Sequence, residues 1–196
     1  MKTKLIISIL CFCTLVSFGQ EEKTLGAFES DTTWLKEIIH FPIGFAPEIN
    51  YEGYEDLRFA KSWRDQAHPD FWCYTFVWHV KGIQKPTLEE LDGYLTSYFN
   101  GLMTAVNKKE NFTIPETNVM LTKTDPSKEA YDFTGKIEMY DSFTSETVIT
   151  LNVRISITHC EIKNESLLRF EFSPKDYDQP IWQRFKDIKI KTDICE

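Results

Sequence analysis

Cys73 and His79 are the residues of this sequence whose types most suggest catalysis, because a thiolate beside an imidazole is a nucleophile–base pair. Both lie in the stretch DFWCYTFVWHV, residues 70–80, whose aromatic and β-branched residues favour a β-strand. Six residues of strand separate the two side chains by about 20 Å, far beyond hydrogen-bonding distance. A Cys73 nucleophile would therefore need His40, His68 or His159 from elsewhere in the fold.

Metal and hydrolase chemistry also lack a local motif. None of the four histidines is spaced from another as H-x-H or H-x-x-x-H, and the motifs G-x-S-x-G and H-E-x-x-H do not occur. Carboxylates cluster around one predicted turn, without the D-x-D-x-D-G pattern of a calcium loop: Glu48, Glu52, Glu55 and Asp56. We interpret this cluster as a solvated acidic loop, and we expect no catalytic residues, no metal and no cofactor.

Three residues are the best candidates for binding. Trp63 lies in the polar loop 61–69, where an exposed indole could stack on a sugar or another flat ligand. Asn152 and Arg154 belong to the polar row of a later predicted strand. The competing interpretation is structural: Trp63 as packing, and the polar row as an ordinary solvated sheet face.

Two hydrophobic periods predict the elements that position these residues. Alternation with period two predicts strands over 56–60, 71–80, 118–124, 131–140, 147–159 and 166–173, and residues 34–39 form either a helical turn or a first strand. Gly53 is expected in a turn between two early strands. Strand 71–80 is apolar on both faces, which predicts a central strand, whereas the alternation of strand 147–159 predicts one solvent-exposed face.

Helical spacing of apolar residues predicts one long helix from Thr87 to about Asn107, opened by a capping box of Thr87 and Glu90. A second helix is expected near Pro180, followed by a short strand over 190–194. The predicted fold class is α+β. An antiparallel sheet is packed by one long amphipathic helix and a C-terminal helix, in the order β-β-β-α-β-β-β-β-α.

The N-terminus, MKTKLIISILCFCTLVSFGQ, has the three parts of a secretory signal peptide: a lysine-bearing start, an apolar run and small residues before Gln20. We expect a signal peptide over 1–19, a flexible segment over 20–30 and a single α+β domain over 31–196. The apolar run is too short to span a bilayer, so we expect no transmembrane anchor after cleavage. Since the whole chain already has a formal charge of −8, nucleic acid is an unfavourable partner.

Three cysteines remain after the predicted cleavage. In an oxidising compartment one pair can close. Cys160 follows a strand and Cys195 ends the chain, so both are expected at a margin of the sheet, whereas Cys73 is expected to be buried. Cys160–Cys195 is the preferred pair, and the alternative is three reduced thiols packed as small apolar side chains.

A strong fold signal without a catalytic constellation favours an exported, periplasmic or extracellular protein that acts as a non-catalytic binding or accessory module. Its partner would be a small molecule, a glycan or a protein. The alternatives are a hydrolase with carboxylates gathered from distant strands and an interaction protein that acts through a sheet edge. An aromatic groove would favour binding, two convergent carboxylates a hydrolase, and an exposed apolar edge the interaction protein.

Overall fold

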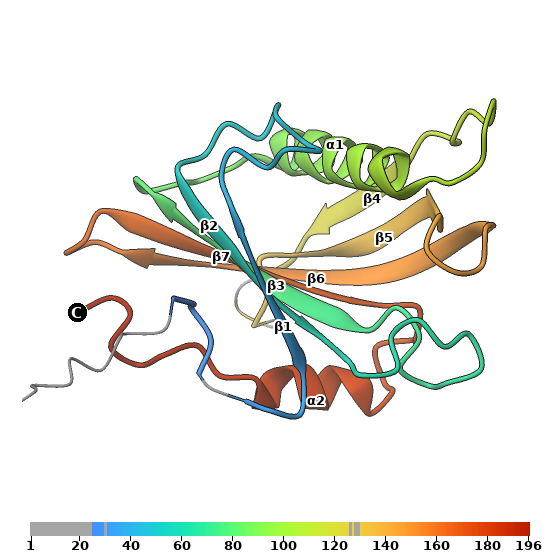
Figure 1. The fold of residues 1–196 in the computed structure, drawn as a ribbon. Helices are drawn as coiled ribbons and strands as arrows, with labels where there is room; N and C mark the ends of the chain where they lie inside the picture. Colours follow the sequence, from blue (N-terminus) through green and yellow to red (C-terminus); the bar gives the residue numbers. More distant parts are fainter. Residues whose placement is uncertain (1–24, 30, 126, 128–129) are drawn as a thin grey trace, which may run out of the picture.

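The computed structural model describes residues 25–29, 31–125, 127 and 130–196. The predicted signal peptide over 1–19 and the cleavage before Gln20 lie outside the described residues. In the described chain, seven strands form one antiparallel sheet in the order β1-β2-β3-β7-β6-β5-β4, with α1 above it and α2 below it in Figure 1. The predicted α+β class and the order of the elements are confirmed.

The bounds of the strands and helices agree closely with the ranges predicted from hydrophobic periodicity. The strands are β1 (Leu35–His40), β2 (Gly53–Phe59), β3 (Tyr74–Lys81), β4 (Asn118–Lys123), β5 (Phe133–Tyr140), β6 (Val148–Cys160) and β7 (Glu165–Ser173). The helices are α1 (Leu88–Val106) and α2 (Ile181–Asp187). Thr87 and Glu90 form the predicted capping box, in which each side chain accepts a hydrogen bond from the backbone N–H of the other residue.

β3 lies inside the sheet, between β2 and β7, as the two apolar faces of its sequence predict. It starts at Tyr74 and not at Phe71, because Trp72 has φ 51°, a left-handed conformation that does not continue a strand. Gly53 opens β2 and is not in a turn between strands. A Cβ on Gly53 would lie 2.1 Å from the carbonyl oxygen of His79, so this close approach of β2 to β3 requires glycine.

The face of the sheet toward α1, called the α1 face, holds the aromatic core. Phe76 and Trp78 of β3 are fully buried there. The ring of Phe76 lies 5.4 Å from that of Tyr98, and the ring of Phe172 lies 5.7 Å from that of Phe99. The amphipathic helix therefore supplies the rings that cover the centre of the sheet.

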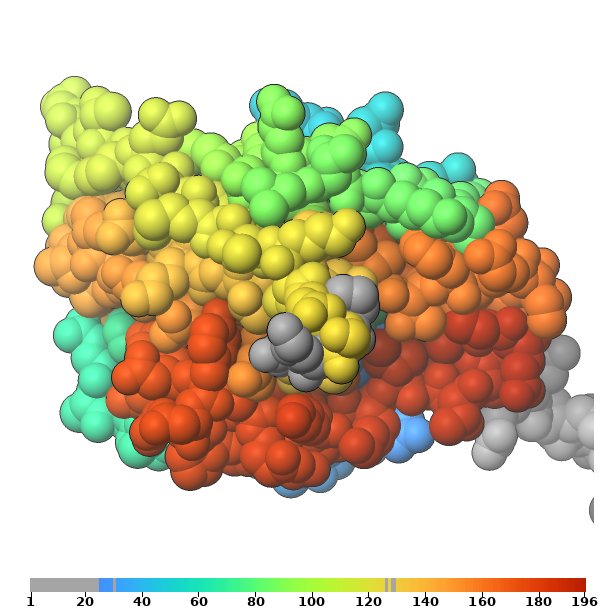
Figure 2. All heavy atoms as spheres, turned by 180° about the vertical axis from the view of Figure 1, so that it is seen from behind, coloured from blue at the N-terminus to red at the C-terminus, as the bar shows by residue number. Residues whose placement is uncertain are grey.

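The opposite face, called the α2 face, is covered by both ends of the described chain. Arg169 of β7 donates hydrogen bonds to the carbonyl oxygens of Phe185 and Ile188 at the C-terminal end of α2, where a cation complements the helix dipole. The guanidinium groups of Arg58 and Arg169 both lie against the ring of Phe28, 5.1 and 5.4 Å from its centre. Figure 2 shows the C-terminal segment, in red, packed along the orange strands β6 and β7.

This cover changes three expectations. Ala27 and Phe28, which the sequence placed in a flexible segment, are buried, and Phe28 forms a single β-bridge with Ile190 where a strand over 190–194 was predicted. The predicted solvent-exposed face of strand 147–159 is wrong at Asn152, which is 6% exposed beneath the C-terminal segment. The solvated acidic loop is also wrong in part, because Glu55 and Asp56 lie in β2 and are fully buried.

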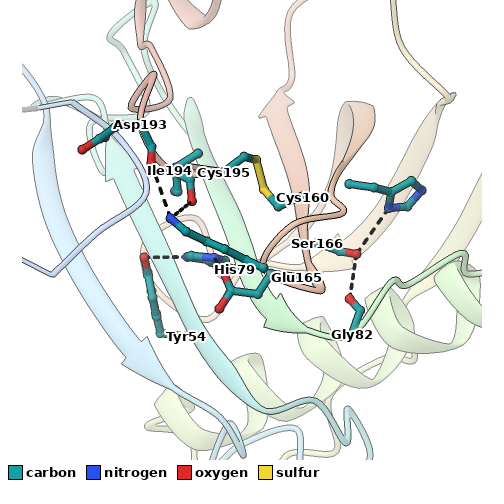
Figure 3. The surroundings of a disulfide bond; sticks show 11 residues. Tyr54, His79, Gly82, Cys160, Glu165, Ser166, Asp193, Ile194 and Cys195 are labelled. Atoms are coloured by element: carbon teal, nitrogen blue, oxygen red, sulfur yellow. Dashed lines mark hydrogen bonds and ion pairs between the residues drawn. A yellow bond between two sulfur atoms is a disulfide. The ribbon is translucent and has the colours of Figure 1, made fainter.

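A disulfide ties the C-terminal segment to the end of β6 (Figure 3). It joins Cys160 to Cys195, the pair preferred from the sequence, with the two Cα atoms 4.8 Å apart. Lys163, in the turn after β6, donates a hydrogen bond of 2.7 Å to the carbonyl oxygen of Ile194. The last residues of the chain are therefore held on the sheet by one covalent bond and a polar contact.

Candidate functional site

An open cavity of about 800 Å³ lies on the α1 face, at the end of β2 and the start of β3. The loop 60–73 and the loop 141–147 close it on one side, and the C-terminal half of α1 forms another wall. Its apolar walls are Leu35, Ile39, Phe45, Leu57, Phe59, Trp63, Trp72, Tyr74, Tyr98, Leu102, Val106 and Phe143. Its exposed polar lining residues, called the mouth, are Lys36, Glu37, Lys61 and Arg64.

Local hydrogen bonds fold the loop 60–73 so that its tryptophans form a wall. Ala60 N–H donates to the carbonyl oxygen of Cys73 at 3.0 Å, and Trp72 N–H donates to that of Trp63 at 2.9 Å. These bonds bring the two ends of the loop together beside the first residue of β3. The indoles of Trp63 and Trp72 then meet edge to face, with ring centres 5.5 Å apart.

Trp63 is the centre of this aromatic wall. Its ring stacks on Phe59 at 5.1 Å, and Phe143 lies edge-on at 5.2 Å. The side chain is 9% exposed, so Trp63 is a wall residue and not the projecting platform that a polar loop suggested. The left-handed φ of Trp72 belongs to the same wall, and backbone strain of this kind persists where the surrounding structure over-determines it.

Two buried polar atoms on cavity-lining side chains have no hydrogen-bond partner among the described residues. They are the hydroxyl of Tyr74 and the indole N–H of Trp72, and both residues are 2% exposed. An unsatisfied buried polar group costs about 1–3 kcal/mol. Both atoms have almost no exposed surface, so they lie behind the aromatic surface of the cavity and not on it.

A buried carboxyl group lies behind the wall. Glu55 of β2 is fully buried, and the hydroxyl of Tyr98 donates a 3.0 Å hydrogen bond to its Oε1. Burial raises the pKa of Glu55 to about 8, since desolvation disfavours the carboxylate more than the bond from Tyr98 favours it. Glu55 is thus mainly protonated at neutral pH. Its Oε2 has no partner among the described residues.

The structure separates the three predicted binding residues. Trp63 lies in the cavity wall, whereas Asn152 and Arg154 lie on the α2 face. Asn152 Nδ2 donates to the carbonyl oxygen of Lys175 at 3.1 Å. The Arg154 guanidinium lies 4.6 Å from the ring of Tyr177 and 4.7 Å from that of Trp182. In this structure the two polar residues hold the C-terminal segment on the sheet.

Sequence reasoning missed Trp72, Tyr74 and Glu55. The two aromatic residues were assigned to the core under the long helix, and Glu55 to a solvated loop. One usable signal was the pair Glu55 and Asp56, because two acids between Tyr54 and Leu57 in a strand-forming segment indicate a special environment. The cavity at the end of α1 had no signal in the sequence.

The thiol and imidazole singled out from the sequence lie apart from the cavity. Cys73 is buried, with its Sγ 3.2 Å from Ser173 Oγ, and burial raises the pKa of the thiol to about 11, which disfavours the reactive thiolate. His79 lies between Tyr54 and Glu165 (Figure 3): Nε2 is 2.7 Å from Glu165 Oε2, and Nδ1 is 2.8 Å from the Tyr54 hydroxyl. This histidine joins three strands through hydrogen bonds.

Comparisons with known proteins add no functional information: no protein-family model, curated protein or solved structure matches the chain. Among the described residues, no group of three or more His, Cys, Asp or Glu side chains could hold a metal ion. Neither helix of the described part is long and apolar enough to cross a membrane. The cavity is therefore the candidate site, on the strength of its geometry.

Proposed function

We propose that this chain is an exported binding protein for a small, largely apolar molecule that occupies the cavity beside Trp63. The observation that carries the proposal is the aromatic wall of Trp63, Trp72 and Tyr74 beside a cavity of about 800 Å³. A concave, mostly apolar surface with a few polar residues at its mouth is typical of small-molecule sites. Rigid aromatic side chains also lose little conformational entropy when a ligand binds.

The size of the cavity supports a small molecule over a polymer. Its volume of about 800 Å³ falls within the range of about 300–1,000 Å³ that is usual for small-molecule sites. Covering a ligand in this space would remove both wall and ligand from water, at about 25 cal/mol for each Å² of apolar surface. The ligand's body would therefore supply most of the affinity.

Export is supported by two independent features. The first 20 residues have the composition of a signal peptide, and Cys160–Cys195 is a disulfide of the kind that persists in oxidising compartments. Mass spectrometry of the protein recovered from outside the cytoplasm should find Gln20, or its cyclised form, at the N-terminus. An intact Met1 in a membrane fraction would contradict export.

The two alternatives receive less support. A hydrolase would need two carboxylates that converge on the cavity. The raised pKa of Glu55 favours this alternative, but its carboxyl group is fully buried. Glu37 is the one acid among the described residues that line the cavity. An interaction through the sheet edge would use β4, where Met120 is 43% exposed, although Lys123 at the end of the same strand disfavours edge pairing.

The proposal is tested with N-phenyl-1-naphthylamine, a neutral apolar fluorophore, titrated into the mature protein. We expect saturable binding at one site per chain, and a loss of affinity of about tenfold or more in Trp63→Ala, since that variant removes the centre of the wall. Trp34→Ala is the matched control, because Trp34 packs against Phe185 on the α2 side and does not line the cavity. Absence of saturable binding, or equal effects of the two folded variants, would overturn the proposal.

A further inference from the structure

Two cations lie at the mouth without a salt bridge in the described part of the chain, although Lys61 interacts electrostatically with Asp31. Lys61 and Arg64 both line the cavity from the loop 60–73 and are exposed. Among the described residues, neither forms an ion pair with a carboxylate. In a chain whose formal charge is −8, two cations without a salt bridge at one cavity are a local reversal of the overall charge.

Arg64 is held over the aromatic wall. Its guanidinium carbon lies 4.6 Å from the ring centre of Trp63 and 4.9 Å from that of Phe143. Stacking of this kind fixes the plane of the guanidinium group while its N–H donors at the edge stay available. Those donors therefore lie next to the aromatic wall that would contact the body of a ligand.

The remaining charges of the mouth do not cancel this pair. The ammonium group of Lys36 donates to the carbonyl oxygen of Leu25 at 2.6 Å, on the other side of β1. Glu37 is the one acid among the described lining residues. It lies opposite Leu57 in the β1–β2 pairing, two residues along β1 from Leu35, which lies opposite Phe59 next to the loop 60–73. Glu55, behind the wall, is mainly uncharged at neutral pH because burial raises its pKa to about 8.

We propose that the ligand is an amphipathic anion, with an apolar body against the Trp63 wall and one carboxylate, sulfonate or phosphate head held at the mouth by Lys61 and Arg64. This inference rests on the proposed function, because it assigns the chemical class of the ligand for the same cavity. Arg64 supplies paired N–H donors in a fixed plane, which suit the oxygen atoms of such a head, and Lys61 supplies a mobile second charge.

The test uses two probes that share one ring system. 8-Anilinonaphthalene-1-sulfonate carries a sulfonate, and N-phenyl-1-naphthylamine has the same rings without it. We expect the wild-type protein to bind the sulfonate more tightly, and the double variant Lys61→Gln/Arg64→Gln to lose about tenfold in affinity for the sulfonate alone, as expected for two partly exposed charge contacts. The preference should also shrink in about 0.5 M salt, where exposed charges are screened.

The control is Lys85→Gln/Lys123→Gln, which removes the same charge from two exposed lysines outside the cavity lining. This control should retain the preference of the wild type. If the wild type binds both probes with equal affinity, or if the mouth variant loses equal affinity for both, recognition of an anionic head group is refuted. The proposal of an apolar binding site would still hold. If neither probe binds the wild type at a saturable site, the proposed function itself fails.

Discussion

Glu55 makes the stability of this protein depend on pH in a way that one substitution should remove. The carboxyl group is fully buried on the α1 face, where the hydroxyl of Tyr98 donates a hydrogen bond to it. Burial raises its pKa from 4.5 to about 8, so the folded protein keeps the proton over a range of pH in which the unfolded chain releases it. Glu55→Gln keeps the shape and the acceptor for Tyr98, and it removes the titration.

The sign follows from linkage. Below pH 4.5 the carboxyl group is protonated in both states, so it does not change the free energy of unfolding with pH. Between pH 4.5 and about 8 the unfolded state ionises and the folded state does not, so stability falls as the pH rises. At about 1.4 kcal/mol per pH unit, the loss is of order 3 kcal/mol at pH 7 and 4 kcal/mol at pH 8.

The assay is urea denaturation of the wild type and of Glu55→Gln at several pH values from 4 to 8. The variant's new amide has no partner for its N–H groups, which adds a cost that does not depend on pH, so the difference between the two proteins is compared across pH and not at one value. We expect the variant to gain of order 4 kcal/mol relative to the wild type over this range. Glu48→Gln, which changes an exposed acid, is the control.

Parallel curves for the wild type and Glu55→Gln would refute the reasoning, because they would mean that Glu55 ionises in the folded protein as readily as in the unfolded chain. If the variant instead loses stability relative to the wild type as the pH rises, the folded state favours the carboxylate. Either result would also remove the argument that the charge of Glu55 is absent from the cavity at neutral pH.

Three further outcomes are expected. Trp78→Ala should lower the free energy of unfolding by about 3–5 kcal/mol, because its ring is fully buried against six other rings of the described chain, and an unchanged melting temperature would contradict its place in the core. Cys195→Ser should cost about 4 kcal/mol, since the bond to Cys160 spans 35 residues, and reduction of the wild type should match it in urea denaturation. Arg154→Ala should cost about 2 kcal/mol by releasing the rings stacked on it, with no change in probe affinity; weaker binding by the folded variant would return Arg154 to the site.

Local patterns explain why so much of the fold could be predicted. Strands β4 to β7 show alternation of period two, and the pairing of successive strands through short turns follows from it. The capping box of Thr87 and Glu90 is a contact between residues three apart, so the start of α1 is visible in the sequence. Bounds were wrong where the backbone departs from the regular pattern, as at Trp72.

The candidate site was predicted only in part. Trp63 could be singled out because an aromatic residue in a polar loop is unusual, but its neighbours Trp72 and Tyr74 could not be distinguished from core residues. Both the wall of a cavity and the interior of a protein need apolar side chains, and the two differ only in whether another segment fills the space beside them. That difference depends on where α1 ends over the sheet.

The sequence by itself determined the order of the elements, the two faces of each strand and the start of the long helix, because these depend on residues close together in the chain. The tertiary structure alone decided which segments cover which face. Residues 27–28 and the C-terminal segment cover the α2 face and bury Asn152, while α1 covers the centre of the other face and leaves the Trp63 wall open. Hydrophobic periodicity shows that a face must be covered, but the covering segment is set by contacts between residues far apart in sequence.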